Sequence, residues 1–249
     1  MKGIKTLALS AAMCLFAVTG AYGEAIYAVQ GGGLYSADTG TGEWVELSGS
    51  WEGTELMTSF SRSLYAIQGD VLYKVARDGT WTELSDSWTG TVGLTAGDNW
   101  LYAVQNDQLY SIDPDNGSWE SIPGSYDGTT HLAWSAGALM VIQNGTLYRT
   151  DPATGEYSEL PSSYSGTTAA AATSSAFFVI QGDALYKVNP STGDYENLGG
   201  GYDGATEMAA YGNYVYCIWQ GTLWKTDVRT GDYESLGSSW EGTTAFCIL

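Results

Sequence analysis

Histidine is nearly absent from this chain of 249 residues, which contains a single one, His131. One histidine excludes a metal site of the usual histidine kind. The sequence also lacks a Gly-x-Ser-x-Gly elbow, a phosphate-binding loop and a cysteine near a histidine. We therefore expect no enzyme, no metal and no cofactor. Paired carboxylates could still cleave glycosidic bonds, so a polysaccharide lyase or hydrolase is the third and weakest hypothesis.

Basic residues are scarce as well, with nine Lys and Arg against 28 Asp and Glu. Such a balance repels nucleic acid and anionic lipid, so neither is an expected partner. Solubility outside the cell explains the acidity most simply. The functional alternative is that the acidic residues attract cations or basic partners.

Apolar runs long enough to cross a bilayer are missing. Residues 1–23 resemble a cleaved secretory signal, with Lys2 and Lys5 before an apolar run over 6–18 and Ala21-Tyr22-Gly23 at the cleavage site. The run is too short for a membrane span, and Cys14 lacks the context of a lipoprotein signal. We expect cleavage before Glu24, a secreted or periplasmic protein, and no membrane insertion.

Cysteine is rare, and only Cys217 and Cys247 follow the predicted signal. Both belong to the last copy of the repeat described below, so a disulfide between them would lock the end of the chain. Two buried free thiols are the alternative. Neighbouring sheets pack about 10 Å apart, whereas bridged Cα atoms lie within about 7 Å, which favours free thiols.

Six copies of one repeat fill residues 24–249. They open at Ile26, Leu64, Leu101, Leu139, Phe177 and Val215. A period of 37 or 38 residues is typical of repeat architectures, in which each unit needs its neighbours to bury its apolar face. We therefore expect one domain over 24–249 and a monomer.

Each copy contains four short segments with strand chemistry, separated by Gly, Asp and Asn turns, and none has a helical period. In the second copy the segments are 64–68, 71–76, 80–85 and 92–96. This pattern predicts an all-β, six-bladed β-propeller with four antiparallel strands per blade. Small residues at 169–172 suit the innermost strand. The fourth strand carries bulky rings that suit the outer gap between blades: Trp44, Trp81, Trp119, Tyr157, Tyr195 and Tyr233.

The two ends of the chain are complementary. It begins with a second-strand segment at 26–30 and ends with a first-strand segment at 245–249. We predict that these segments pair, so that blade 1 contains both termini.

Aromatic, acidic and amide residues recur on one predicted face, where the loops between blades meet the ends of the second strands. A ring stacks on the apolar face of a sugar while carboxylates and amides bind its hydroxyls, so this face is the candidate ligand site. In the alternative, the rings only fill the gap between blades. The candidate residues are Gln30, Trp51, Glu52, Gln68, Trp88, Gln105, Tyr126, Asp127, Gln143, Tyr164, Gln181, Tyr202, Asp203, Trp219, Trp240 and Glu241.

The third copy, residues 101–125, resembles a tectonin repeat, with a strand end of the aromatic-x-Val-Asn type and a later Trp-x-x-Ile-x-Gly segment. Gln105 stands where that family usually has Asn, and Tyr102 where it has Trp. The Asp-Pro-x-Thr-Gly turn from Asp151 is similar to a Kelch turn, and Asp78-Gly79-Thr80-Trp81 is similar to a sialidase Asp-box. The tectonin resemblance implies a β-propeller and a lectin-like activity.

These observations lead to two main hypotheses. The first is a secreted protein that binds glycans at several sites through the ring-bearing face, so that weak sites add up to avidity. The second is a scaffold for extracellular or cell-surface proteins.

Overall fold

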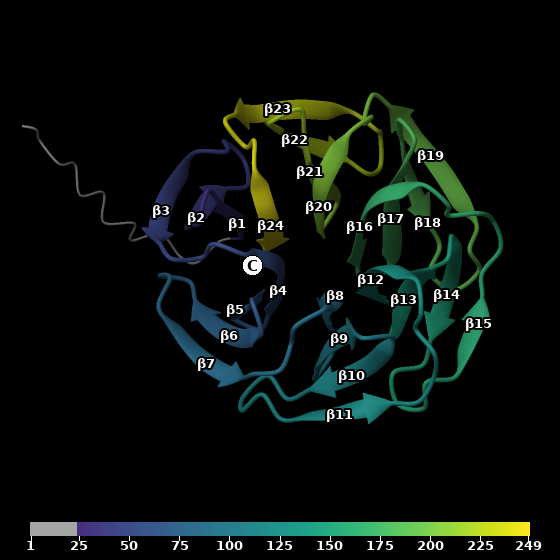
Figure 1. Cartoon of the computed structure of the whole chain (residues 1–249). Helices are drawn as coiled ribbons and strands as arrows, with labels where there is room; N and C mark the ends of the chain where they lie inside the picture. Colours follow the sequence, from purple (N-terminus) through teal and green to yellow (C-terminus); the bar gives the residue numbers. More distant parts are fainter. Residues whose placement is uncertain (1–23) are drawn as a thin grey trace, which may run out of the picture.

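A computed structural model describes residues 24–249. They form six four-stranded antiparallel sheets arranged around a central axis (Figure 1), which is the six-bladed β-propeller that the repeat predicts. The predicted signal segment, residues 1–23, lies outside the described residues. Over 24–249 there is no helix with the length and apolarity of a membrane span.

The blades are numbered in chain order, and their strands are given from the axis outward. The twenty-four strands are, in blade 1, β24 (Thr243–Ile248), β1 (Ala25–Gln30), β2 (Gly33–Asp38) and β3 (Trp44–Ser48); in blade 2, β4 (Thr54–Phe60), β5 (Ser63–Gln68), β6 (Val71–Ala76) and β7 (Trp81–Ser85); in blade 3, β8 (Thr91–Ala96), β9 (Leu101–Gln105), β10 (Gln108–Ile112) and β11 (Trp119–Ile122); in blade 4, β12 (Thr129–Ser135), β13 (Ala138–Gln143), β14 (Thr146–Thr150) and β15 (Tyr157–Glu159); in blade 5, β16 (Thr167–Thr173), β17 (Ala176–Gln181), β18 (Ala184–Val188) and β19 (Tyr195–Gly200); in blade 6, β20 (Ala205–Tyr211), β21 (Tyr214–Trp219), β22 (Thr222–Asp227) and β23 (Tyr233–Ser238).

Burial changes with distance from the axis in the way that the residue types require. The second strand of each blade is apolar along almost its whole length and is buried on both faces, as in β13 and β17. It lies between two neighbouring blades, so side chains on both sides of the sheet reach a core. In blade 5 the innermost strand, which lies closest to the axis, is made of small residues such as Ala169 and Ala171 in β16.

The ring closes through strand pairing between the two ends of the described chain. β24 pairs antiparallel with β1, and Ile26 lies opposite Ile248. The N–H of Ala25 donates to the carbonyl oxygen of Leu249 at 2.8 Å, and the N–H of Leu249 donates back to Ala25 at 2.9 Å. This confirms the predicted pairing of 245–249 with 26–30.

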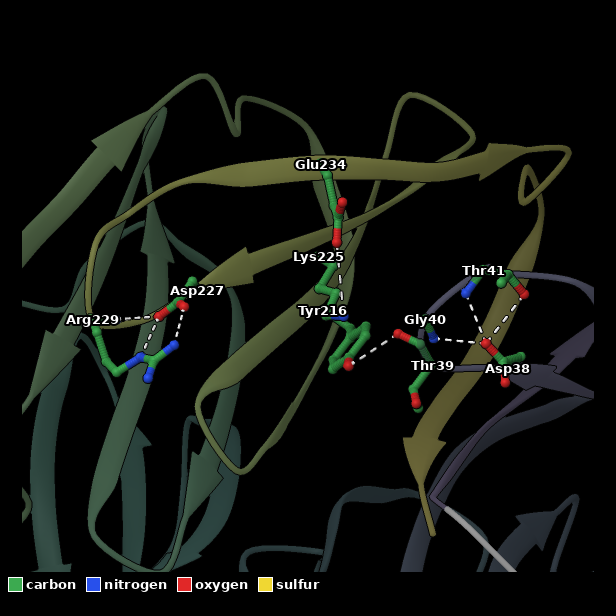
Figure 2. Close-up of polar contacts among 9 residues, drawn as sticks. All are labelled: Asp38, Thr39, Gly40, Thr41, Tyr216, Lys225, Asp227, Arg229 and Glu234. Atoms are coloured by element: carbon green, nitrogen blue, oxygen red, sulfur yellow. Dashed lines mark hydrogen bonds and ion pairs between the residues drawn. The ribbon is translucent and has the colours of Figure 1, made fainter. Parts of the chain in front are cut away.

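Turns between the third and fourth strands connect neighbouring blades on the face opposite the loops. Figure 2 shows the hydroxyl of Tyr216, from blade 6, donating to the carbonyl oxygen of Thr39 in the turn of blade 1 at 3.3 Å. Asp38 caps that turn by accepting from the N–H groups of Gly40 and Thr41, both at 2.8 Å, and these bonds lower the pKa of its carboxyl group. Gly42 has a φ of 72°, and a Cβ there would collide with the carbonyl oxygen of Leu236 in blade 6.

Deleting residues 245–249 tests the closure. All five side chains are buried, and the deletion leaves β1 without its inner partner. We expect loss of the cooperative thermal transition or a large fall in Tm, measured by circular dichroism. A control chain with five Gly and Ser residues added after Leu249 keeps the pairing. A truncated protein with the control's Tm would contradict the role of this strand.

Candidate functional site: the loop face, the rim and the axial channel

The loops that join successive blades carry an aromatic ring at the same position, and all six rings are buried. Their exposed fraction is only 2–5%. A sugar cannot stack on a ring that is covered by protein, so the structure supports the gap-filling alternative and corrects the prediction that these rings bind ligand. The six residues are Trp51, Trp88, Tyr126, Tyr164, Tyr202 and Trp240.

Trp51 shows why the rings are buried. It packs in one cluster with Val29 and Leu34 of blade 1 and with Leu64 and Val75 of blade 2. Its indole N–H donates to Ser48 Oγ at 3.0 Å, so the polar atom is satisfied as well. Desolvation acts on the tyrosines at this position, and burial raises the pKa of both Tyr126 and Tyr164 to about 12.

Glutamine amides hold these loops from the next blade. Gln68 Nε2 donates to the carbonyl oxygens of Ser50 and Glu52, both at 2.9 Å, on either side of Trp51. The N–H of Trp51 itself donates to Gly32 of the preceding blade at 2.9 Å. The amide nitrogens therefore hold the loop backbone, a structural role beside the predicted ligand-binding one, which stays a prediction. The same pair of bonds is made by Gln30, Gln105, Gln143 and Gln181.

Trp219 takes the place of the glutamine in blade 6 and makes one of the two hydrogen bonds to the loop that the glutamine makes in the other blades. The indole N–H donates to the carbonyl oxygen of Asp203 at 2.5 Å. The ring also packs against Trp224, with 5.7 Å between centroids. Trp219 is thus a variant of this backbone contact, not the ligand-binding exception that its position in the repeat suggested.

Among the residues of the predicted site, only the acids are fully exposed. Glu52, Asp127, Asp203 and Glu241 are exposed. The loops between blades and the turns between second and third strands contain no Lys or Arg. We call the face that carries these loops and turns the loop face. It is acidic, with no positive charge among its loops and turns.

Exposed rings form a second, unpredicted arrangement on the outermost strands. The rings predicted to fill the outer gap are instead 51–65% exposed. Each contacts a ring of the third strand, with centroids 5.2–5.7 Å apart and planes at 73–89°. The outermost strand borders solvent because no further strand covers it, which corrects the expectation. The exposed rings are Trp44, Trp81, Trp119, Tyr157, Tyr195 and Tyr233.

A polar side chain accompanies each exposed ring. It lies on the outermost strand directly opposite the third-strand ring and is exposed in all six blades. We call each set of exposed ring, third-strand ring and polar residue a rim strip. The strips are Trp44, Tyr35 and Glu46; Trp81, Tyr73 and Glu83; Trp119, Tyr110 and Ser121; Tyr157, Tyr148 and Glu159; Tyr195, Tyr186 and Asn197; and Tyr233, Trp224 and Ser235.

At blade 6 the rim is hollowed into a groove of about 320 Å³, lined by Tyr214, Lys225, Asp227, Asp232, Tyr233 and Glu234. Lys225 Nζ lies 4.4 Å from the Tyr214 ring centroid and 3.7 Å from a Glu234 carboxylate oxygen. Asp227 forms an ion pair with Arg229 that holds its pKa at about 2 (Figure 2). The groove therefore offers a ring, a cation and carboxylates.

The innermost strands enclose a cavity of about 230 Å³ on the propeller axis. Its lining includes Glu207 and His131, and burial raises the pKa of Glu207 to about 7 and lowers the pKa of His131. His131 thus lines the channel. Glu207 was missed by sequence reasoning, although it is the one acid at a position that other copies fill with Leu, Gly, His or Ala.

Cys217 and Cys247 are free and buried. Cys217 packs against blade 5, with Ile180 and Leu185, whereas Cys247 packs against blade 2, with Trp51 and Leu64. The two thiols face different gaps, so the candidate disulfide does not form. Among residues 24–249, no three metal-ligating side chains come together.

Removing a buried and an exposed ring separates packing from surface roles. We expect Trp51→Ala to lower the free energy of unfolding by ~3–5 kcal/mol, because it leaves a cavity between two blades. Trp81→Ala removes a ring that is mostly in solvent and should change it by ~1 kcal/mol or less. Denaturant unfolding measures both, and equal effects would contradict the assignment of Trp51 to the core.

Glu207 gives a prediction with a defined pH window. Because its pKa is raised from 4.5 to about 7 in the folded protein, its contribution to stability is greatest below pH 4.5 and is lost as the pH rises through about 7. We expect Glu207→Gln to be more stable than the original protein at pH 8, by ~3 kcal/mol, and nearly equal to it at pH 4. Denaturant unfolding at both pH values checks this. Glu241→Gln removes an exposed carboxylate as a control.

Comparison with known proteins supports the fold and no finer grouping. No protein-family model matches the chain, and a search of curated proteins finds no relative. Among solved structures, a chain from "Crystal structure of Nidogen/Laminin Complex" is similar with a TM-score of 0.77, at 11% sequence identity, over 91% of this chain and 98% of that one. No family match supports the tectonin resemblance. The likeness identifies the chain as a six-bladed β-propeller.

Proposed function

We propose that this protein is an exported, multivalent binding protein without catalytic activity, and that glycans bind at its six rim strips. The predicted signal segment supports export, and the absence of catalytic motifs from the sequence supports binding alone. The location of the proposed site differs from the loop face that the sequence suggested, because the loop rings are buried.

The observation that carries the proposal is the repetition of an exposed ring beside a hydrogen-bonding side chain in all six blades. Exposed aromatic surface that recurs in this way is unusual in a soluble protein unless it contacts something. An aromatic face packs against the C–H groups of a pyranose, and carboxylate, amide or hydroxyl groups bind its hydroxyls. Glu46, Glu83 and Glu159 provide carboxylates, Asn197 an amide, and Ser121 and Ser235 hydroxyls.

Binding to a glycan array tests this proposal. The triple variant Trp44→Ala, Trp81→Ala, Trp119→Ala removes three adjacent strips. We expect its apparent affinity for an immobilised glycan to fall by more than ~10-fold, because fewer sites engage the surface together. The variant's circular dichroism and Tm establish that it is folded.

The matched control changes the loop face and leaves the rim intact. Glu52→Gln with Glu241→Gln should bind like the original protein, whereas a loop-face lectin would lose affinity. The proposal is wrong if the original protein binds no glycan, or if the triple variant binds as well as the original.

A protein-interaction scaffold is the second candidate. The outermost strands β3, β7, β11, β15, β19 and β23 each pair on one side only, so a partner's strand could add to that free edge. The similar solved propeller comes from a complex of two proteins, by its title. Recovery of one specific partner in a pull-down, unaffected by added sugars, would favour this candidate.

A further inference from the structure

The axial cavity differs chemically from every other surface of the molecule. Part of its lining is apolar, with Met57, Leu94, Met208 and Phe246. The lining also includes Thr130, Thr168 and Thr206, which are exposed at the second position of their strands. A ligand that fits here has an apolar body and a polar head.

Charge on the axis is of one sign. The six innermost strands contain no Lys or Arg, and their ionisable side chains are Glu55, His131, Glu207, Tyr211 and Cys247, of which Glu55, His131 and Glu207 line the cavity. Cys247 faces the gap between blades 1 and 2 and is not in the cavity lining. Burial lowers the pKa of His131, so the imidazole is neutral at pH 7 and above and does not neutralise the carboxylates.

Glu207 is half-buried and has no hydrogen-bond or ion-pair partner among residues 24–249. A desolvated carboxylate without a partner is unfavourable, and a bound cation would relieve that cost. Glu55 lies nearer the mouth and is exposed. The mouth opens on the loop face, where the exposed acids Glu52, Asp127, Asp203 and Glu241 attract cations over a longer range.

We propose that this cavity binds a primary ammonium group carried on a short alkyl chain, with the ammonium at the carboxylate of Glu207 and the alkyl chain against the apolar side chains of the lining. A primary ammonium suits the site better than a quaternary one, because its N–H groups donate to Glu207 and to the threonine hydroxyls. The site is separate from the rim strips, so it does not depend on the proposed glycan binding.

Methionine methyl groups report occupancy directly. Met57 and Met208 line the cavity, whereas Met140 is buried between blades 4 and 5. We would label the methionine methyl carbons with 13C and titrate the protein with n-butylammonium at pH 8. The Met57 and Met208 signals should move together along one binding curve while Met140 stays in place and shows that the fold is intact.

Charge and its position are tested by matched probes and variants. n-Butanol, which has the same alkyl chain but no charge, should bind at least 10-fold more weakly. Glu207→Gln should lower the affinity for n-butylammonium at least 10-fold, and Glu241→Gln, which removes an acid away from the axis, should change it by less than twofold. Lysine capped at both ends should give the same shifts if the site accepts a side chain.

The pH dependence gives an independent readout. Because protonation of Glu207 competes with the ammonium and its pKa is about 7, affinity should fall about 30-fold between pH 8 and pH 5.5. In Glu207→Gln most of this dependence should disappear. The proposal is overturned if n-butylammonium moves neither Met57 nor Met208, if n-butanol binds equally well, or if Glu207→Gln binds as tightly as the original protein.

Discussion

The connection between neighbouring blades depends on one repeated loop, and the rest of the propeller is built around it. In the loop before blade 2, the ring of Trp51 fills the gap between blades 1 and 2. Its backbone is held by the preceding blade through Gly32 and by the following blade through Gln68. Apolar burial supplies most of the stabilisation, while the hydrogen bonds fix the position of the loop backbone. Because every gap uses this arrangement, the ring closes without a disulfide.

This constraint also determines where function can lie. The aromatic rings of the loop face hold the blades together and are buried, so they are excluded as ligand contacts despite their suitable chemistry. Ligand binding is left to surfaces that the blade contacts do not use. These are the outer rim, where the last strand has no covering neighbour, and the axis, where six strands converge but do not fill the space between them.

The two remaining surfaces have different symmetry. The rim repeats one ring and one polar group six times, which suits many weak contacts with a repetitive ligand. The axis is asymmetric, because Glu207 and His131 each occur in one blade at a position where the other blades have Leu, Gly or Ala. A single site for one small ligand is consistent with that asymmetry. The exposed acids of the loop face lie away from the axis, on the loops between blades, and give that face part of the strong negative charge of the sequence.

The sequence by itself determined the fold, because the 38-residue period, the four strand segments and the complementary ends leave one closed arrangement. It also placed the small residues of β16 near the axis. Only the tertiary structure decided which aromatic residues are buried. Trp88 and Trp81 belong to the same copy of the repeat and are equally apolar, but Trp88 lies between two sheets and Trp81 on the last strand of one. Whether a ring is buried depends on the sheet that lies opposite it, which local sequence does not encode. For the same reason, only the folded structure shows that the Glu207 carboxylate lies on the axis without a partner among residues 24–249.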